Sequence, residues 1–264
     1  MTVQHEVMAG AEAWSYEGHG SCAACGVVVI HGFTGTALAV RPLAEALSRQ
    51  GFRVTQPRLP GHGTSWRELA RMRYADWLAE VERATDDLET HCRVVVPVGL
   101  SMGATLALDV GSSGREKVGG VVAINPQLLD RQGVMARLAP LVGRLIPAVP
   151  AHLAGLPPDD VARAGVTERG YRWVPIRAAQ SLLDELPRVR TQLRELHVPL
   201  LVAYSLHDRC VASENSTAIP NLTSAPTELL ALERSRHLAP LDYDSELLEK
   251  RVVSFVQRVC ESEA

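Results

Sequence analysis

The chain has 264 residues, of which 46% are hydrophobic and 22% charged, and its formal net charge is −3 at pH 7. A chain of this length and apolar content can bury one large core, and α/β folds of this size are routinely single domains. The slightly negative balance provides no basic field that would gather nucleic acid or an acidic membrane surface. We therefore expect no nucleic-acid partner, whereas a small neutral substrate stays open.

Targeting signals and cysteines bear on the compartment. Residues 1–6 lack the basic start and apolar segment of a secretory signal, and no stretch approaches the ~18 consecutive apolar residues of a membrane span. The five cysteines show no framework spacing, which favours reduced thiols and a cytoplasmic location. Cys22 and Cys25 form one C-x-x-C pair that precedes a strand and has no second pair. We expect neither a metal nor a redox function there.

Short apolar runs alternate with amphipathic stretches over the first half of the chain. The run at residues 26–30 is unbroken and rich in β-branched side chains, which is typical of a strand buried on both faces of a parallel sheet. Further strands are expected at residues 10–19, 52–55, 93–98 and 118–124, and helices at 38–50, at 74–90 and from about 102. This alternation favours an α/β fold with a mostly parallel, doubly wound sheet.

The alternation stops between Asn125 and Leu186, in a segment with many prolines, leucines and valines. We interpret residues 125–186 as a helical cap inserted over the edge of the sheet, between a first core part at 1–124 and a second at 187–264. The alternative is a loose loop, but the apolar content predicts that the segment folds against something. Strands at 198–204 and 227–232 and a helix at 247–259 complete the core.

The segment from Gly99 to Gly103 fits the pattern G-x-S-x-G and lies between an expected strand and an expected helix. A serine hydroxyl is a weak nucleophile unless it is exposed, held rigid and placed beside a base. A sharp strand-to-helix turn supplies the exposure and the rigidity, and glycines at its ends remove side chains that would collide there. The context favours a nucleophile at Ser101 over a chance match in an ordinary loop.

Two further candidates follow later strands, so that Ser101, Asp208 and His237 fall at the carboxyl ends of three strands, where parallel sheets assemble their sites. The order nucleophile, acid, histidine is the one that α/β-hydrolases use. In this hypothesis His237 takes the proton of Ser101 and later passes it to the leaving group. Asp208 holds the imidazole in the required tautomer and stabilises the imidazolium.

Other histidines and acids compete for these roles. His62 is a rival histidine, and His207 precedes Asp208 on one loop, from which it cannot easily bridge that acid to the serine. Asp242 and Asp244 are rival acids that we interpret as charges at the N-terminus of the last helix.

An ester hydrolase also needs backbone donors for the developing oxyanion. The N–H of Met102 lies at the expected start of a helix, where it can face negative charge. We expect the second donor from the glycine-flanked Phe33, in the loop after the strand at 26–30. The alternative for Phe33 is a simple tight turn with a core phenylalanine.

Five motifs together resemble the bacterial monoacylglycerol lipases and the related small carboxylesterases of the α/β-hydrolase superfamily. They are HGFTGT (31–36), RPLAEA (41–46), PRLPGHGT (57–64), GLSMG (99–103) and HLAPLDYD (237–244). The resemblance covers the core almost end to end. It implies hydrolysis of medium or long acyl esters of a small polar alcohol. It also implies Ser101, Asp208 and His237 as the catalytic residues, with Phe33 and Met102 as backbone donors.

The resemblance fades in the cap. Such lipases commonly present a run of tyrosine, acid, base, any residue and proline, where this chain has YRWVP at 171–175. We expect Arg172 and Trp173 to remodel the pocket that receives the alcohol. Independently of any family, the apolar cap suits a greasy acyl chain, or it could dock onto a second subunit as a homodimer.

Other chemistries share this architecture. A thioesterase and a cofactor-free perhydrolase remain alternatives, as does a hydrolase-fold receptor that binds a ligand without turnover. We expect no cofactor and no metal. We expect the partner to be a small, lipid-like ester.

Overall fold

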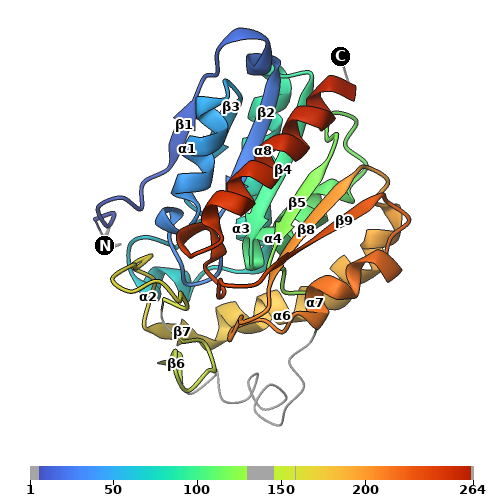
Figure 1. The fold of residues 1–264 in the computed structure, drawn as a ribbon. Helices are drawn as coiled ribbons and strands as arrows, with labels where there is room; N and C mark the ends of the chain where they lie inside the picture. Colours follow the sequence, from blue (N-terminus) through green and yellow to red (C-terminus); the bar gives the residue numbers. More distant parts are fainter. Residues whose placement is uncertain (1–5, 130–145, 158, 263–264) are drawn as a thin grey trace.

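The computed structural model describes residues 6–129, 146–157 and 159–262. Its central sheet has seven strands in the order β1-β3-β2-β4-β5-β8-β9 (Figure 1). They are β1 (Trp14–Tyr16), β2 (Cys25–Ile30), β3 (Arg53–Gln56), β4 (Val94–Leu100), β5 (Val121–Ile124), β8 (Leu200–Ser205) and β9 (Thr227–Leu232). Only β1 among these seven runs antiparallel to its neighbour. The predicted mostly parallel, doubly wound sheet is confirmed.

Helices cover both faces of the sheet (Figure 1). They are α1 (Arg41–Arg49), α2 (Trp66–Leu69), α3 (Tyr74–His91), α4 (Met102–Gly111), α6 (Ile176–Gln192), α7 (Glu214–Thr217) and α8 (Ser245–Ser262). Strand β2 explains the layering, because alternate side chains of a strand point to opposite faces. Val27 and Val29 pack with α1 and α8, whereas Val28 and Ile30 pack with α3 and α4. The unbroken apolar run therefore serves two cores at once.

Several element bounds differ from the sequence prediction for local reasons. Strand β1 covers only Trp14–Tyr16 of the expected 10–19, as a short antiparallel edge strand. Helix α1 begins at Arg41 because a 3-10 turn occupies Ala37–Ala39 and a proline stands in the first turn of the helix. Helix α8 extends beyond the expected 247–259 at both ends.

The cap contains a small antiparallel pair of its own, β6 (Ala148–Pro150) with β7 (Trp173–Pro175). Helix α6 follows β7 directly and runs through Leu186, the expected end of the cap, without a break. Its buried side chains Leu182, Leu186 and Val189 belong to the same apolar cluster as α3 and α4. The boundary drawn at 186 thus falls inside a helix that packs on the core. Residues 130–145 of the expected cap lie outside the described residues.

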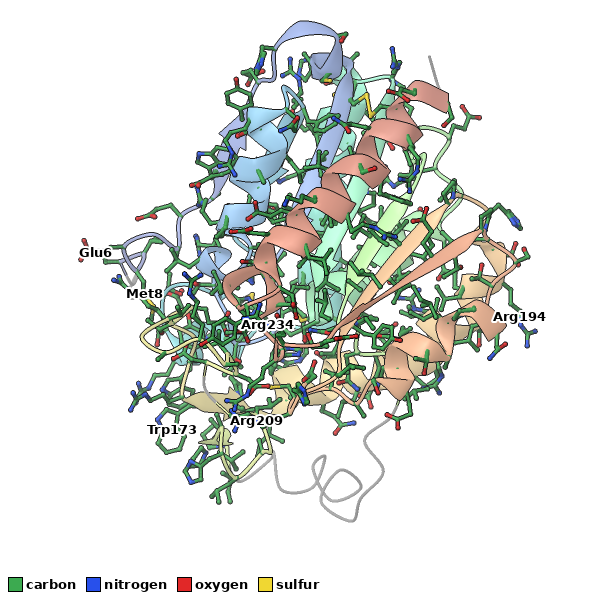
Figure 2. All side chains as sticks on the ribbon, viewed as in Figure 1. Glu6, Met8, Trp173, Arg194, Arg209 and Arg234 are labelled. Atoms are coloured by element: carbon green, nitrogen blue, oxygen red, sulfur yellow. A yellow bond between two sulfur atoms is a disulfide. The ribbon has the colours of Figure 1, made fainter. Side chains whose placement is uncertain are left out.

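Cysteines depart from the expectation of reduced thiols. A disulfide joins Cys25, at the start of β2, to Cys260, near the end of α8, with Cα atoms 6.1 Å apart (Figure 2). The partners are 235 residues apart, so spacing along the chain offered no sign of the pair. Cys22 is free, and Cys25 is joined to Cys260 rather than to Cys22.

Membrane crossing would require a long apolar helix. Within the ranges that the structure describes, no helix has both the length and the apolar content to traverse a bilayer.

Candidate active site

Ser101 lies at the turn between β4 and α4, with the unusual backbone angles φ 58° and ψ −119°. A non-glycine residue with positive φ is strained and persists only where its surroundings enforce it. The two flanking glycines make the turn possible. A Cβ atom at Gly99 would collide with the backbone of Gly103, and one at Gly103 would collide with the carbonyl oxygen of Ile30. The G-x-S-x-G pattern thus specifies the geometry of a nucleophile elbow.

The loop after β2 lies directly against this serine. A Cβ atom at Gly32 would come within 3.2 Å of Cβ of Ser101, and Phe33 and Ser101 line one cavity. In the described part of the chain, no protein acceptor is recorded for the backbone N–H of Phe33 or of Met102. These two backbone N–H groups therefore remain the candidate donors to an oxyanion at Ser101.

Two buried histidines, His31 and His62, pack against each other beside this loop. The rings of His31 and His62 meet edge to face, with centroids 4.9 Å apart, and His62 also contacts Phe33 and Trp77. Burial lowers the pKa of His31 to about 4 and holds the pKa of His62 well below its ordinary value. Both rings are therefore neutral near pH 7. His62 is completely buried and does not line the cavity that Ser101 lines, so its position supports a packing role.

His237 and Asp208 form the polar pair predicted from the sequence. Nδ1 of His237 lies 2.7 Å from Oδ2 of Asp208. The other oxygen, Oδ1, accepts the backbone N–H groups of Cys210 and Val211 at 2.7 and 2.8 Å. Burial lowers the pKa of His237, but the charge and hydrogen bond of Asp208, followed by the charges of Glu168 and Asp160, raise it above 6.5 overall. The carboxylates thus favour the imidazolium.

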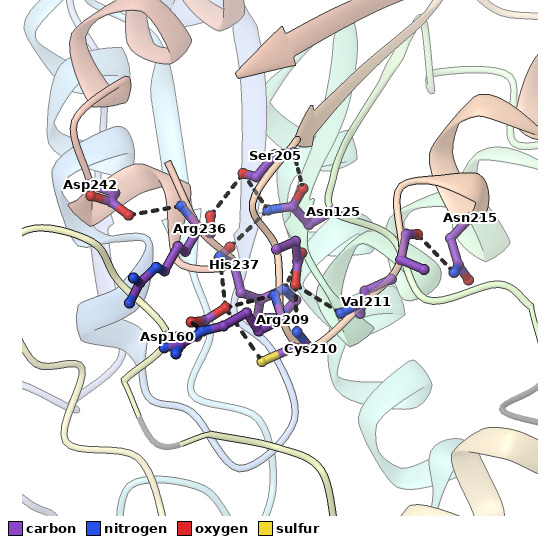
Figure 3. Close-up of polar contacts among 12 residues, drawn as sticks. Asn125, Asp160, Ser205, Arg209, Cys210, Val211, Asn215, Arg236, His237 and Asp242 are labelled. Carbon is purple, nitrogen blue, oxygen red and sulfur yellow. Dashed lines mark hydrogen bonds and ion pairs between the residues drawn. The ribbon is translucent and has the colours of Figure 1, made fainter. Parts of the chain in front are cut away.

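The sheet fixes the loop that carries His237 through two polar residues that sequence reasoning missed. Asn125, at the end of β5, donates from Nδ2 to the carbonyl oxygen of His237 at 2.8 Å and to Oγ of Ser205 at 3.1 Å. Ser205, at the end of β8, donates from Oγ to the carbonyl oxygen of Arg236 at 2.8 Å (Figure 3). Asn125 has φ 45°, a value that asparagine tolerates better than most residues. The tolerance of asparagine for such backbone angles was the one signal that the sequence offered.

Ser101 and His237 open onto the same cavity of about 510 Å³, which lies between the sheet edge and the cap. Its size is typical of a site for a small-molecule ligand. Aliphatic side chains of the cap and of α6 form much of its wall, among them Val149, Leu153, Leu156, Val174, Ile176, Leu182 and Leu183. The cavity can therefore hold an alkyl chain within reach of the serine.

Glu168 brings a carboxyl group from the cap into this wall. The group lies so close to the loop after β2 that a Cβ atom at Gly35 would collide with it. Burial raises the pKa of Glu168 to about 7, although the charge of His237 opposes that shift. An acid that is partly protonated near neutral pH can donate as well as accept a hydrogen bond. Sequence reasoning missed Glu168 because nothing local distinguishes it from a surface glutamate.

The same part of the cap is bonded to the core loops. The N–H of Tyr171 donates to the carbonyl oxygen of Thr34 at 2.8 Å. The Tyr171 hydroxyl accepts from the N–H of Thr64 at 2.7 Å and donates to the carbonyl oxygen of Gly61 at 2.9 Å. The glycine-rich loop at 57–64 therefore anchors the cap.

Arg172 and Trp173 do not line the cavity, contrary to the sequence expectation. Strand β7 points Val174 inward and Trp173 outward, because neighbouring residues of a strand face opposite sides. The indole of Trp173 is 44% exposed and stacks on Trp66 at the surface of the cap (Figure 2).

Rival groups prove to be structural or remote. His207 is exposed and lies in a surface depression with Arg209, Arg234 and Arg236 rather than in the cavity. Asp242 accepts backbone N–H groups from Ala162, Arg163, Arg236 and Tyr243. Asp244 accepts those of Arg234 and Ser235. Asp244 directly precedes α8 and accepts the N–H of Leu248 with its carbonyl oxygen, so it lies at the N-terminus of the last helix as expected. The carboxylates of Asp242 and Asp244 also hold loop backbone.

One group of side chains has metal-binding composition. Asp208, Cys210 and His237 bring ligand atoms within 4.8 Å of one another. Asp208 already bonds His237 through one oxygen and two backbone N–H groups through the other. This donor set fits an acid–histidine pair better than a metal centre.

Comparisons with known proteins identify the family to which the chain is similar. The family model described as serine aminopeptidase, S33 (Hydrolase_4) matches residues 23–244. A thermostable monoacylglycerol lipase of Bacillus sp. (strain H-257) is 32% identical over 256 residues, which cover 97% of this chain and 98% of that protein. A carboxylesterase of Bacillus subtilis (strain 168) is 24% identical, with 88% and 92% covered. A solved structure from work on the metagenome-derived lipolytic enzymes LipS and LipT has a TM-score of 0.87 at 32% identity, with 96% and 100% covered.

Proposed function

Because the chain belongs to the serine aminopeptidase S33 family of α/β-hydrolases, we propose that it cleaves carboxylic esters through an acyl-enzyme on Ser101. The resemblance to monoacylglycerol lipases and small carboxylesterases is confirmed, and the protein is a carboxylic ester hydrolase. One observation carries the proposal. His237, which is bonded to Asp208, opens onto the cavity that the strained Ser101 also lines.

In the proposed reaction, Oγ of Ser101 attacks the ester carbonyl carbon while Nε2 of His237 takes the hydroxyl proton. The N–H groups of Phe33 and Met102 stabilise the oxyanion of the tetrahedral intermediate. His237 then passes its proton to the departing alkoxide, which leaves an acyl group on Ser101. Water hydrolyses this intermediate with His237 again as the base. Asp208 accepts the Nδ1–H of His237 throughout and stabilises the imidazolium.

The proposed substrate is a monoacylglycerol or a simple ester with a medium or long acyl chain. The aliphatic wall of the cavity supports the acyl part, since burying each CH₂ group contributes about 0.8 kcal/mol. The polar wall groups Glu168 and Gln127 support a small hydroxylated alcohol. The printed name of the Bacillus sp. relative supports glycerol as that alcohol.

An active-site-directed fluorophosphonate tests the nucleophile. We expect the folded protein to be labelled at Ser101 and the Ser101→Ala variant to stay unlabelled. Turnover of a p-nitrophenyl ester should fall by about 10⁴-fold or more in that variant, as in other triads. Unlabelled wild-type protein without turnover would contradict the proposal and favour a ligand-binding role.

A substrate panel tests the finer claim. It compares monoacylglycerols, alkyl esters and p-nitrophenyl esters of matched chain length, with thioesters and hydrogen peroxide as further arms. We expect oxygen esters to be preferred and rates to rise with acyl length up to a limit set by the cavity. A preference for thioesters, or a perhydrolase activity, would reassign the reaction on the same residues.

Two further expectations stay predictions. A homodimer through the cap would bury the exposed side chains of Ile146, Leu153 and Trp173, which light scattering on the purified protein can detect. The cytoplasmic location can be checked by fractionating the source cells.

A further inference from the structure

Asp160 of the cap is a buried carboxylate with no part in the reaction proposed above. Its side chain is 0% exposed, although the residue lies in a stretch of the cap without helix or strand. Oδ1 accepts from Nε of Arg209 at 2.7 Å. Oδ2 accepts from the N–H of Arg209 at 3.0 Å and from the N–H of His237 at 3.3 Å, with Sγ of Cys210 at 4.0 Å (Figure 3).

These contacts link two loops that the sheet presents separately. The acid loop, residues 206–211, follows β8 and carries Asp208. The histidine loop, residues 233–238, follows β9 and carries His237. Asp160 accepts hydrogen bonds from Arg209, the residue that follows Asp208, and from the backbone N–H of His237. Its own carbonyl oxygen also accepts the N–H of Leu238 at 3.0 Å, so both sides of His237 meet this one cap residue.

The neighbouring cap residues extend the same attachment. Asp242, which follows the histidine loop, accepts the N–H groups of Ala162 and Arg163 at 2.7 and 3.1 Å. Arg236 donates from Nη1 to the carbonyl oxygen of Val161 at 3.3 Å. The segment at 160–163 and the segment at 236–242 therefore hold each other through reciprocal bonds, with Asp160 at the end nearest the acid–histidine pair.

We propose that Asp160 is a positioning residue for ester hydrolysis, which sets the separation and orientation of His237 relative to Asp208 by bonding both of their loops at once. The inference rests on the proposed function of that pair. A small misplacement of a catalytic group can cost as much as 10²-fold in rate. The cap would thereby align the base as well as enclose the substrate.

Charge gives Asp160 a second effect that separates positioning from mere packing. Three carboxylates face His237: Asp208 from the acid loop, and Glu168 and Asp160 from the cap, and all three raise its pKa. Arg209 carries the opposite charge, and its side chain is 53% exposed. Removing the carboxylate of Asp160 should lower the pKa of His237, whereas removing the guanidinium of Arg209 should raise it.

Asp160→Asn tests the proposal in the full-length protein, because it keeps the shape of the side chain and removes its charge. We expect kcat on a short p-nitrophenyl ester to fall about 10- to 100-fold, while KM changes less than about two-fold. The acid limb of the pH profile of kcat/KM should move to lower pH. Wild-type protein assayed in parallel reports separately on the proposed function, through its labelling and turnover.

Asp109→Asn is the matched control. Asp109 is also a buried carboxylate, near the C-terminal end of α4, and it pairs with Arg188 and Tyr74. This variant should lose stability but keep the wild-type kcat and pH profile at temperatures where it is folded. An Asp160→Asn protein that is folded and behaves like this control would overturn the proposal.

Arg209→Gln decides the question if Asp160→Asn does not fold. The exposed guanidinium can be removed while both backbone bonds to Asp160 remain possible. We expect a fall of a few-fold in kcat and an acid limb displaced to higher pH, opposite in sign to Asp160→Asn. An unchanged kcat would show that the pair of Asp160 and Arg209 does not position His237, and a displacement of the acid limb to lower pH would contradict the proposed effect of their charges.

Discussion

The carboxyl ends of the strands and the cap contribute to the cavity in different ways. At the carboxyl ends of the strands, the turn around Ser101 is marked in the sequence by its neighbours Gly99 and Gly103, where any side chain would collide with backbone atoms. In the cap, Asp160, Glu168 and Tyr171 act through partners tens of residues away. The proposed nucleophile thus carries a local sequence signal, whereas the proposed alignment of its base and the shape of the cavity depend on long-range contacts.

The largest expected effect tests the sheet side of this contrast. Asp208→Asn should lower kcat by about 10⁴-fold, because an asparagine favours the wrong imidazole tautomer while leaving the shape of the site intact. Ester hydrolysis and circular dichroism measured together separate this loss from unfolding. Substantial activity in a folded variant would indicate that another acid serves His237.

Gly99→Ala should destabilise the fold strongly. The added methyl group meets backbone atoms of Gly103 and Ala104, which cannot move aside as a flexible side chain would. We expect a loss of more than about 3 kcal/mol in the free energy of unfolding, at the upper end of overpacking effects. Gly114→Ala is the control for denaturant unfolding, because that glycine has open space around it, although its φ of 77° adds some strain.

Tyr171→Phe probes the cap side. The change leaves the N–H of Thr64 and the carbonyl oxygen of Gly61 without their buried partner, which costs about 1–3 kcal/mol. Because Tyr171 lines the cavity and joins the cap to the core, KM should rise more than kcat falls. Tyr243→Phe, at an exposed position, should change neither quantity. A drop in kcat without a rise in KM would contradict the assignment of Tyr171 to substrate fit.

The pH profile gives a smaller effect. In the proposed mechanism the neutral imidazole of His237 is the base. Its pKa is raised above the ordinary value of 6.5, so kcat/KM should decline as pH falls through a value higher than 6.5. Glu168→Gln removes one of the anions that raise this pKa and should move the acid limb to lower pH. It also abolishes the ionisation of Glu168 near pH 7. A limb that stays in place would show that Glu168 does not act on His237.

Trp173→Ala should have the smallest effect. Its side chain stacks on Trp66 outside the cavity, so the ratio of rates on a monoacylglycerol and on the matched ethyl ester should not change. Val174→Ala is the comparison, because it removes part of the cavity wall and so enlarges the cavity. A change of preference in the Trp173 variant would restore the sequence-based expectation that this residue shapes the alcohol pocket.

Sequence patterns predicted what depends on local physics. The buried strand at 26–30, the elbow and the chain order of Ser101, Asp208 and His237 all carry signals within a few residues. The polar contacts of the cap carry none, because Thr36 and Glu168 are separated by 132 residues, and Asp160 and His237 by 77. Strand β7 has only three residues, too few for an alternation that would reveal which side chain faces inward.

Helix α6 has a practical consequence for exchanging parts between relatives. Its first half supplies Ile176, Leu182 and Leu183 to the cavity, and its second half packs on α4 through residues such as Val189. A chimera spliced at residue 186 would divide α6 between two parent proteins. Side chains from one parent would then pack against a surface from the other. A graft that ends before Ile176, or takes the whole helix to Gln192, keeps each packing surface with its own partner. Recombination of acyl specificity in this family should therefore respect helices rather than the apparent edge of the insertion.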